Sequence, residues 1–93
     1  MTGARDEAET LALAALTFLA GDSHRLARFM GSTGLTPEGL RAGLGEIRVL
    51  GGVLDYLADH EALLIACAEA IGVEPEDLSR ARARLRPPAE AED

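Results

Sequence analysis

Two histidines, one cysteine and a run of arginines carry the side chains on which a functional site could be built. His24 follows Ser23, and His60 lies between Asp59 and Glu61. Consecutive side chains on a helix point about 100° apart, so neither set converges as a metal site or a nucleophile with its base requires. Neither histidine begins an i, i+4 ligand pair, and the chain has no GxGxxG or P-loop motif. We therefore predict no catalytic, metal or cofactor site, and we do not expect an enzyme.

Cys67 is the only cysteine of the chain and lies in the apolar run Ala62–Ala68. One cysteine cannot form an internal disulfide or a multi-thiolate metal site. A buried cysteine without such partners behaves as a small hydrophobic residue. We predict that Cys67 is an unreactive core residue.

Four arginines alternate with small or apolar residues near the end of the chain. On a helix, Arg80 and Arg84 share one side, while Arg82 and Arg86 share another. Acids at the start of this helix and arginines at its end complement the helix dipole, which favours a solvated helix. The alternative is a docking site for an acidic partner or a phosphate backbone, with Arg80 and Arg84 as possible contacts.

The segment from Cys67 to Leu85 also has the spacing of a DNA-binding helix-turn-helix, with Ala68 four residues before the turn glycine Gly72. Any two helices packed across a three-residue turn have similar spacing. In such a motif the first residues of the second helix meet the bases, and here they include Glu74. Carboxylates are unfavourable there because affinity for DNA comes from cations that displace counterions. DNA binding is therefore the alternative function, and nucleic acid is disfavoured as a partner.

Glycines, prolines and capping residues divide the chain into helices, and strand-forming residues show no alternation. Asp59 is predicted to cap the fifth helix and Gly72 to end it. The fold class is all-α, with about six short helices. They are expected over Asp6–Ala20, from Asp22 or Ser23 to Gly34, Thr36–Gly45, Glu46–Ala58, His60–Ile71, and from Pro75 to the residue before Pro87.

The chain resembles itself at an offset of 38 residues. Ala14–Asp22 aligns with Gly52–His60, and Gly34–Leu40 aligns with Gly72–Leu78. Ala/Leu-rich helices can match by chance, but the shared Gly-x-x-Pro-Glu-x-Leu punctuation favours a duplication. Three-helix units of this size cannot bury their own apolar faces alone.

We therefore predict two pseudo-symmetric three-helix units, residues 11–48 and 49–86, that share one core and superpose by a rotation near 180°. Pro37 and Pro75 should then occupy equivalent first-turn positions. The first and fifth helices are apolar nearly all round, which is typical of central helices. The expected core comprises Leu16, Phe18, Leu19, Leu26, Phe29, Leu40, Leu54, Leu57, Leu64, Ile65, Ile71, Leu78 and Leu85.

The fourth helix contains two adjacent glycines, Gly51 and Gly52, and the only tyrosine, Tyr56. Each glycine costs the helix about 1 kcal/mol relative to alanine, which the close approach of a neighbouring helix would explain. Tyrosine is enriched at protein interfaces, so the outer side of this helix is a candidate contact surface centred on Tyr56. The alternative is that Tyr56 belongs to the core, like Phe18 at the equivalent position.

The 93 residues carry a net charge of −7 and consist of 47% hydrophobic but only 3% aromatic residues. This predicts one domain over residues 1–86 and a disordered acidic tail over 87–93. The acidic opening residues do not fit a signal peptide, and the longest uncharged stretch, Thr10–Gly21, is too short for a bilayer. We expect a cytoplasmic protein that does not bind membranes. Its function is predicted to be non-enzymatic interaction with an unknown protein partner or with itself.

Several segments together resemble a known family. They are an acidic Ala/Leu-rich opening helix, RFMGSTGLTPEGLR at Arg28–Arg41, VLDYLADHEALLIACAEAIGVEPE at Val53–Glu76, and a closing Arg/Ala helix. This pattern resembles the bacterial family known as domain of unknown function 3572. The resemblance implies a short, standalone helical protein and no assigned activity or site residues. The glycine-rich Gly39–Glu46 segment departs from the pattern, so the third helix is expected to be short or irregular.

Overall fold

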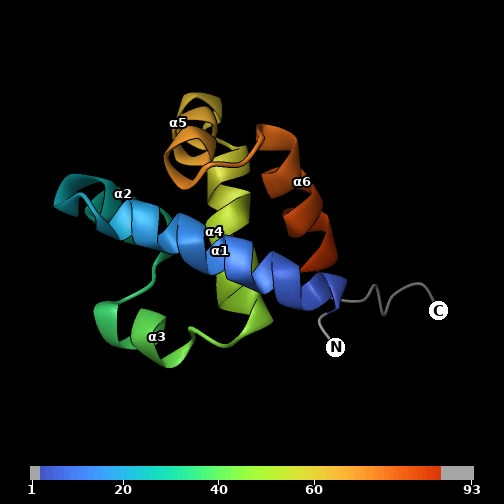
Figure 1. Ribbon diagram of the computed structural model, residues 1–93. Helices are drawn as coiled ribbons and strands as arrows, with labels where there is room; N and C mark the ends of the chain where they lie inside the picture. Colours follow the sequence, from blue (N-terminus) through green and yellow to red (C-terminus); the bar gives the residue numbers. More distant parts are fainter. Residues whose placement is uncertain (1–2, 87–93) are drawn as a thin grey trace.

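A computed structural model of the protein describes residues 3–86, and this part of the chain contains six α-helices and no strand (Figure 1). The prediction of an all-α fold is confirmed. The helices are α1 (Ala4–Ala20), α2 (Ser23–Thr33), α3 (Pro37–Ala42), α4 (Ile47–Ala58), α5 (Glu61–Ile71) and α6 (Pro75–Arg84). No helix within these residues is long and apolar enough to cross a bilayer. The predicted tail, residues 87–93, lies outside the described part.

The longest helix, α1, is central because it packs against α2, α4, α5 and α6. Figure 1 shows α1 crossing α4, with α5 and α6 on one side and α3 set apart on the other. The prediction that α5 is equally central is wrong. Only Cys67 and Ala68 of α5 are buried, and Ile65 is 42% exposed. Apolar residues all round a helix therefore do not by themselves bury every face of it.

Local interactions set most helix ends where the sequence predicts them. The Asp22 carboxylate accepts hydrogen bonds from the backbone N–H groups of His24 and Arg25, and caps α2. Pro37 and Pro75 each begin a helix, at equivalent first-turn positions.

Two predicted helix ends differ in the structure. Asp59 follows the end of α4 instead of capping α5, and the N-cap position of α5 is held by His60, whose side chain makes no capping bond. The His60 ring instead lies with Nδ1 2.8 Å from the Tyr56 carbonyl oxygen. Helix α3 ends at Ala42, before the expected Gly45. Gly43 follows it in a buried position, where an added Cβ atom would collide with Val49 Cγ2.

The core lies between α1, α4 and α6, and alanines make up much of it. Ala8, Ala12 and Ala15 of α1 are almost fully buried, so α1 approaches its neighbours closely. Seven of the thirteen predicted core residues are buried, and all but one of the others are partly buried. The exception is Ile65.

The two halves of the chain share helix boundaries at the 38-residue offset. Helices α2 and α5 have equal lengths and equivalent ends, and the glycines that follow them, Gly34 and Gly72, have φ angles of 80° and 81°. Only glycine adopts such angles without strain. The third helices differ, because α6 packs against α1, α4 and α5, whereas α3 packs against no helix to a comparable extent. The predicted rotation near 180° between the two units stays a prediction.

The two glycines of α4 have different surroundings. A Cβ atom added to Gly51 would lie 3.6 Å from the Leu85 carbonyl oxygen, an ordinary van der Waals distance, so this neighbour does not require glycine. A Cβ atom added to Gly52 would meet no atom within 4 Å. The predicted close approach is therefore wrong for Gly52.

Candidate functional site

An apolar depression with exposed leucines lies between α1, α2 and α3, and we call it the α1–α3 groove. Its volume is about 420 Å³. Eight of its ten lining residues are apolar, and the exceptions are Thr17 and Arg41. The lining residues are Leu13, Leu16, Thr17, Ala20, Leu26, Met30, Pro37, Leu40, Arg41 and Leu44.

The groove is open because α3 is short and stands away from α1. Leu13 on α1 and Leu44 after α3 both line it, and each is 39% exposed. Together with Ile65 they are the large hydrophobic residues with substantial exposure in residues 3–86. Leu16 lies deeper and is only 7% exposed. Exposed apolar side chains gathered in a depression are typical of interaction sites.

The groove contains little polar chemistry. The Thr17 hydroxyl donates a hydrogen bond to the Leu13 carbonyl oxygen at 2.9 Å, within α1. Arg41 is the only charged lining residue, and it is exposed. The ion pairs of the described residues are Arg80–Asp77 and Arg82–Asp55, so Arg41 is in neither. The groove thus offers an apolar surface with one cation at its edge.

Sequence reasoning did not identify this groove. The apolar pattern of α1 gives no reason to distinguish the exposed Leu13 from the buried Leu16, because both lie on an almost uniformly apolar helix. Leu44 and Arg41 lie in the Gly39–Glu46 segment, which the sequence predicts to be short or irregular but does not connect with a site. The expected short third helix was the one signal that pointed to it.

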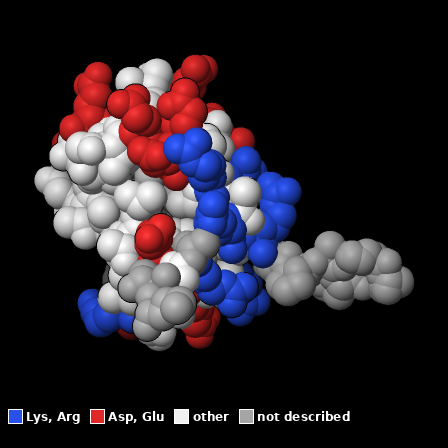
Figure 2. All heavy atoms as spheres, turned by 45° about the vertical axis from the view of Figure 1, so that its right-hand side comes forward, with Lys and Arg blue, Asp and Glu red and all other residues white. Residues whose placement is uncertain are grey.

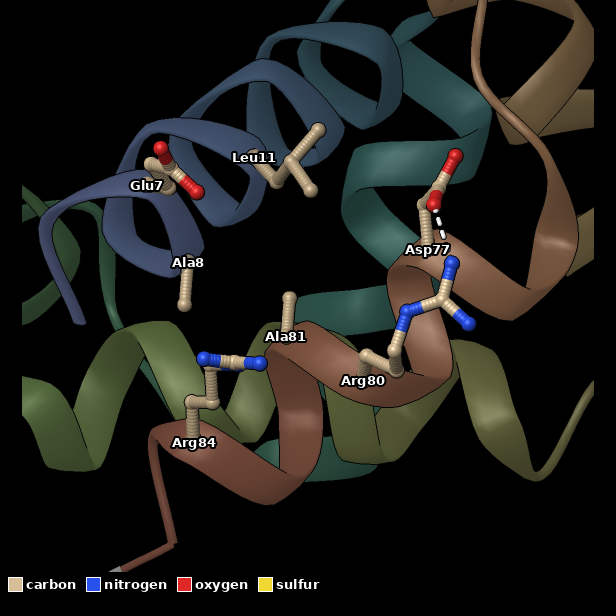
Figure 3. Close-up of a pocket in the computed structure, with 7 residues that line it drawn as sticks. All are labelled: Glu7, Ala8, Leu11, Asp77, Arg80, Ala81 and Arg84. Atoms are coloured by element: carbon tan, nitrogen blue, oxygen red, sulfur yellow. Dashed lines mark hydrogen bonds and ion pairs between the residues drawn. The ribbon is translucent and has the colours of Figure 1, made fainter. Parts of the chain in front are cut away.

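Arg80 and Arg84, the predicted contact arginines, line a small cleft between α6 and the start of α1 (Figure 3). The cleft has a volume of about 130 Å³, and Glu7 faces it from α1. Arg80 donates a hydrogen bond to Asp77 at 2.6 Å. The Glu74 backbone N–H, and then Arg80, lower the pKa of the Asp77 carboxyl below its usual value.

The arginines of α6 belong to a basic band on one side of the molecule. Figure 2 shows this band running beside a group of acidic side chains at one end of the molecule. Arg80, Arg84 and Arg86 are exposed, and Arg82 is partly buried beside Asp55. The structure thus brings Arg80 and Arg84 together on one cleft, and their role as partner contacts stays a prediction.

Tyr56, the third predicted contact residue, lies in the core. Its side chain is 8% exposed, and its ring packs edge-on against Phe29 with 5.2 Å between the centroids. The His60 ring lies 4.4 Å from it on another side. The prediction that Tyr56 anchors an exposed contact surface is therefore wrong, because α4 is covered on the side that carries this residue. The alternative reading, a core tyrosine, describes its position.

The cysteine and the serine–histidine pair lie on different helices, Cys67 on α5 and Ser23 with His24 on α2. Residues 3–86 contain no group of three or more His, Cys, Asp or Glu residues placed to hold a metal ion. Cys67 is fully buried, and this burial raises the pKa of its thiol to about 11. Ser23 and His24 are exposed at the start of α2, where the Asp22 carboxylate is occupied by backbone N–H groups.

Helices α5 and α6 are joined by a tight turn, as the helix-turn-helix spacing requires. The backbone N–H groups of Gly72 and Val73 both donate to the Ala68 carbonyl oxygen at 2.9 Å. Glu74 and Glu76 are exposed at the start of α6. The end of α6 that would enter a DNA groove therefore presents carboxylates, which phosphates repel.

Comparison with known proteins gives a family but no activity. A family profile described as "Protein of unknown function (DUF3572)" matches residues 5–88, which is most of the chain. Searches of curated proteins and of solved structures gave no match. The family resemblance noted in the sequence is confirmed, and the chain belongs to the family Protein of unknown function (DUF3572).

Proposed function

We propose that this protein is a non-enzymatic binding module whose α1–α3 groove holds an apolar helical segment of another protein. The observation that carries the proposal is the groove itself, an apolar depression of about 420 Å³ with Leu13 and Leu44 exposed on its two walls. Leaving two leucines exposed is unfavourable for an isolated chain, and a bound apolar segment removes them from water. Amphipathic helices bind such grooves through side chains spaced by three or four residues.

The chemistry of the groove supports binding rather than catalysis. Arg41 is its only charged residue, and no carboxylate, imidazole or thiol lines the groove. The Thr17 hydroxyl already donates to the backbone of its own helix. Ten residues line the groove, whereas a stable interface between two folded proteins uses roughly 20–30 residues on each side. A short segment therefore fits better than a second folded copy.

The second half of the chain carries an ion pair at two positions that align with groove residues. At the 38-residue offset, Thr17 and Leu44 correspond to Asp55 and Arg82. There Arg82 Nε lies 2.5 Å from Asp55 Oδ1, and the cavity beside this pair is only about 150 Å³. An ion pair therefore links α4 and α6 at these positions. The first half has leucine and threonine instead, which supports a groove that is open for a ligand.

The test introduces the aligned aspartate and arginine of the second half into the groove. Helical peptides are selected from a displayed library against the wild-type protein, and their affinities are measured by fluorescence anisotropy. We expect the selected peptides to share apolar residues at i, i+3 or i+4 spacing. The Thr17→Asp/Leu44→Arg double variant should bind them at least about tenfold more weakly, a loss of roughly 1.4 kcal/mol. Its circular dichroism spectrum should match that of the wild type.

Ile65→Ser serves as the matched control, because Ile65 is an exposed apolar residue on α5, outside the groove. Its peptide affinities should equal those of the wild type. Equal affinities for the wild type and the double variant would contradict the proposal. Sedimentation of the wild type and of the double variant tests for self-association. A dimer that the wild type forms and the double variant does not would make a second copy of the chain the occupant of the groove.

The alternative function, a helix-turn-helix-like DNA-binding protein, has less support. The exposed Glu74 and Glu76 at the start of α6 oppose contact with phosphates. A mobility-shift assay at low salt is expected to give no sequence-specific complex. We also propose a cytoplasmic location, because the single cysteine, Cys67, is a buried thiol.

A further inference from the structure

We infer that the helical segment held by the α1–α3 groove carries a carboxylate that pairs with Arg41; the inference rests on the proposed function. Arg41 is the one charged residue among those that line the groove. Its side chain is exposed and is in neither of the ion pairs found within residues 3–86. An apolar groove with one available cation at its edge selects an apolar segment with an acidic residue beside its anchors.

The place of Arg41 on the groove fixes where this acidic residue lies. Arg41 is in the last turn of α3 and comes three residues before Leu44, one of the exposed leucines. The carboxylate of the partner should therefore lie within one helical turn of the apolar side chain that contacts Leu44. Glu38, one turn before Arg41, is also exposed and repels a carboxylate at the other end of α3. The segment should accordingly bind with its acidic residue toward Leu44.

The contact favours a carboxylate of a peptide over other groups. A guanidinium forms two parallel hydrogen bonds with a carboxylate, and a carboxylate is the anionic group that unmodified protein side chains supply. The net charge of −7 does not prevent the contact, since charges farther than about 8 Å are screened at physiological salt. Because the pair is exposed, we expect its effect on affinity to be small, about two- to fivefold.

The experiment exchanges the charges on both sides. The peptide probe is one selected on the wild-type groove, prepared with Glu, Gln or Lys at the position flanking the anchor that contacts Leu44. Wild type should bind the Glu peptide about two- to fivefold more tightly than the Gln peptide, and the Lys peptide more weakly than either. Arg41→Glu should reverse this order, and Arg41→Gln should abolish it. These differences should shrink when the salt concentration is raised from roughly 50 to 500 mM, because the screening length then falls about threefold.

Arg28→Glu is the matched control, because it makes the same change in net charge on α2 at an exposed residue outside the groove. It should leave the preference for the Glu peptide unchanged. Equal affinities of the three peptides for wild type and Arg41→Glu would overturn the inference. Sensitivity of that binding to Thr17→Asp/Leu44→Arg would still uphold the groove as the binding site. If the double variant also bound unchanged, the proposed function itself would fail.

A fatty acid also combines an apolar chain with a carboxylate, so dodecanoate is titrated in parallel. We expect dodecanoate to displace the peptide only weakly and independently of Arg41. Tighter binding of dodecanoate than of the Glu peptide, lost in Arg41→Gln, would assign the carboxylate to a lipid and overturn the inference of a protein segment.

Discussion

Replacement of Gly52 by alanine should stabilise the protein, although Gly52 lies within a helix that belongs to the core. Glycine inside a helix is less favourable than alanine by about 0.8–1.0 kcal/mol, because its backbone loses more freedom on folding. A Cβ atom at Gly52 would meet no atom within 4 Å, so no steric cost offsets this gain. We therefore expect Gly52→Ala to raise the free energy of unfolding by about 1 kcal/mol.

Gly43→Ala is the matched substitution with the opposite expected sign. A Cβ atom at Gly43 would collide with Val49 Cγ2 and lie 3.2 Å from the Gly39 carbonyl oxygen. The φ angle of Gly43 is −98°, which alanine also adopts, so the cost is steric and does not come from backbone strain. Overpacking of this kind destabilises proteins by about 1–3 kcal/mol.

Thermal and urea unfolding, followed by far-ultraviolet circular dichroism, measure both effects. For a domain of this size, about 1 kcal/mol corresponds to a shift of roughly 4–8 °C in Tm. Gly52→Ala should raise Tm by that amount and Gly43→Ala should lower it, with the urea m-value unchanged. Destabilisation by Gly52→Ala would refute the reasoning, since it would mean that the open space beside Gly52 is filled in solution.

Three further predictions follow from buried or capping residues. Tyr56→Ala should lower the free energy of unfolding by about 3–5 kcal/mol in urea titrations, while Tyr56→Phe should keep most of the stability. A near-neutral Tyr56→Ala would contradict the burial of this side chain. Cys67 should not react with a thiol reagent at pH 8 until the protein unfolds, because burial raises its pKa to about 11; rapid labelling of folded protein would contradict its burial. The pKa of Asp22 is lowered by backbone hydrogen bonds from Arg25 and His24, so its contribution to stability is present above about pH 4 and is lost at lower pH. Asp22→Asn should therefore lose less stability than the wild type between about pH 5 and pH 2, as measured by urea titrations. Equal losses in the two proteins would show that the Asp22 carboxylate is not the group that titrates.

The amino-acid sequence was sufficient to predict the six helices and most of their ends. A capping carboxylate such as Asp22, a first-turn proline such as Pro75 and a left-handed glycine such as Gly72 act on backbone groups within a few residues. These signals do not depend on what packs nearby, so they can be read from the chain alone. The same holds for the burial of Cys67, which lies in an apolar run without other cysteines.

The surroundings of side chains on uniformly apolar helices depended on the tertiary structure. Along α1, periodicity does not distinguish Ala12, which is fully buried, from Leu13, which is 39% exposed, because both neighbours are apolar. Ile65 was expected in the core on the same grounds and lies on the surface. Tyr56 was a candidate for the surface and is buried against Phe29. Which face of a helix is covered is set by the helices that reach it from elsewhere in the chain.

The candidate site also depends on the tertiary structure. Leu13 and Leu44 are 31 positions apart in the sequence, and no local signal connects them. They line one groove because α3 ends at Ala42 and does not pack closely on α1, whereas Arg82, which aligns with Leu44 in the second half of the sequence, pairs with Asp55. Whether such a seam opens or closes depends on the distance between two helices, and that distance results from the packing of the whole core.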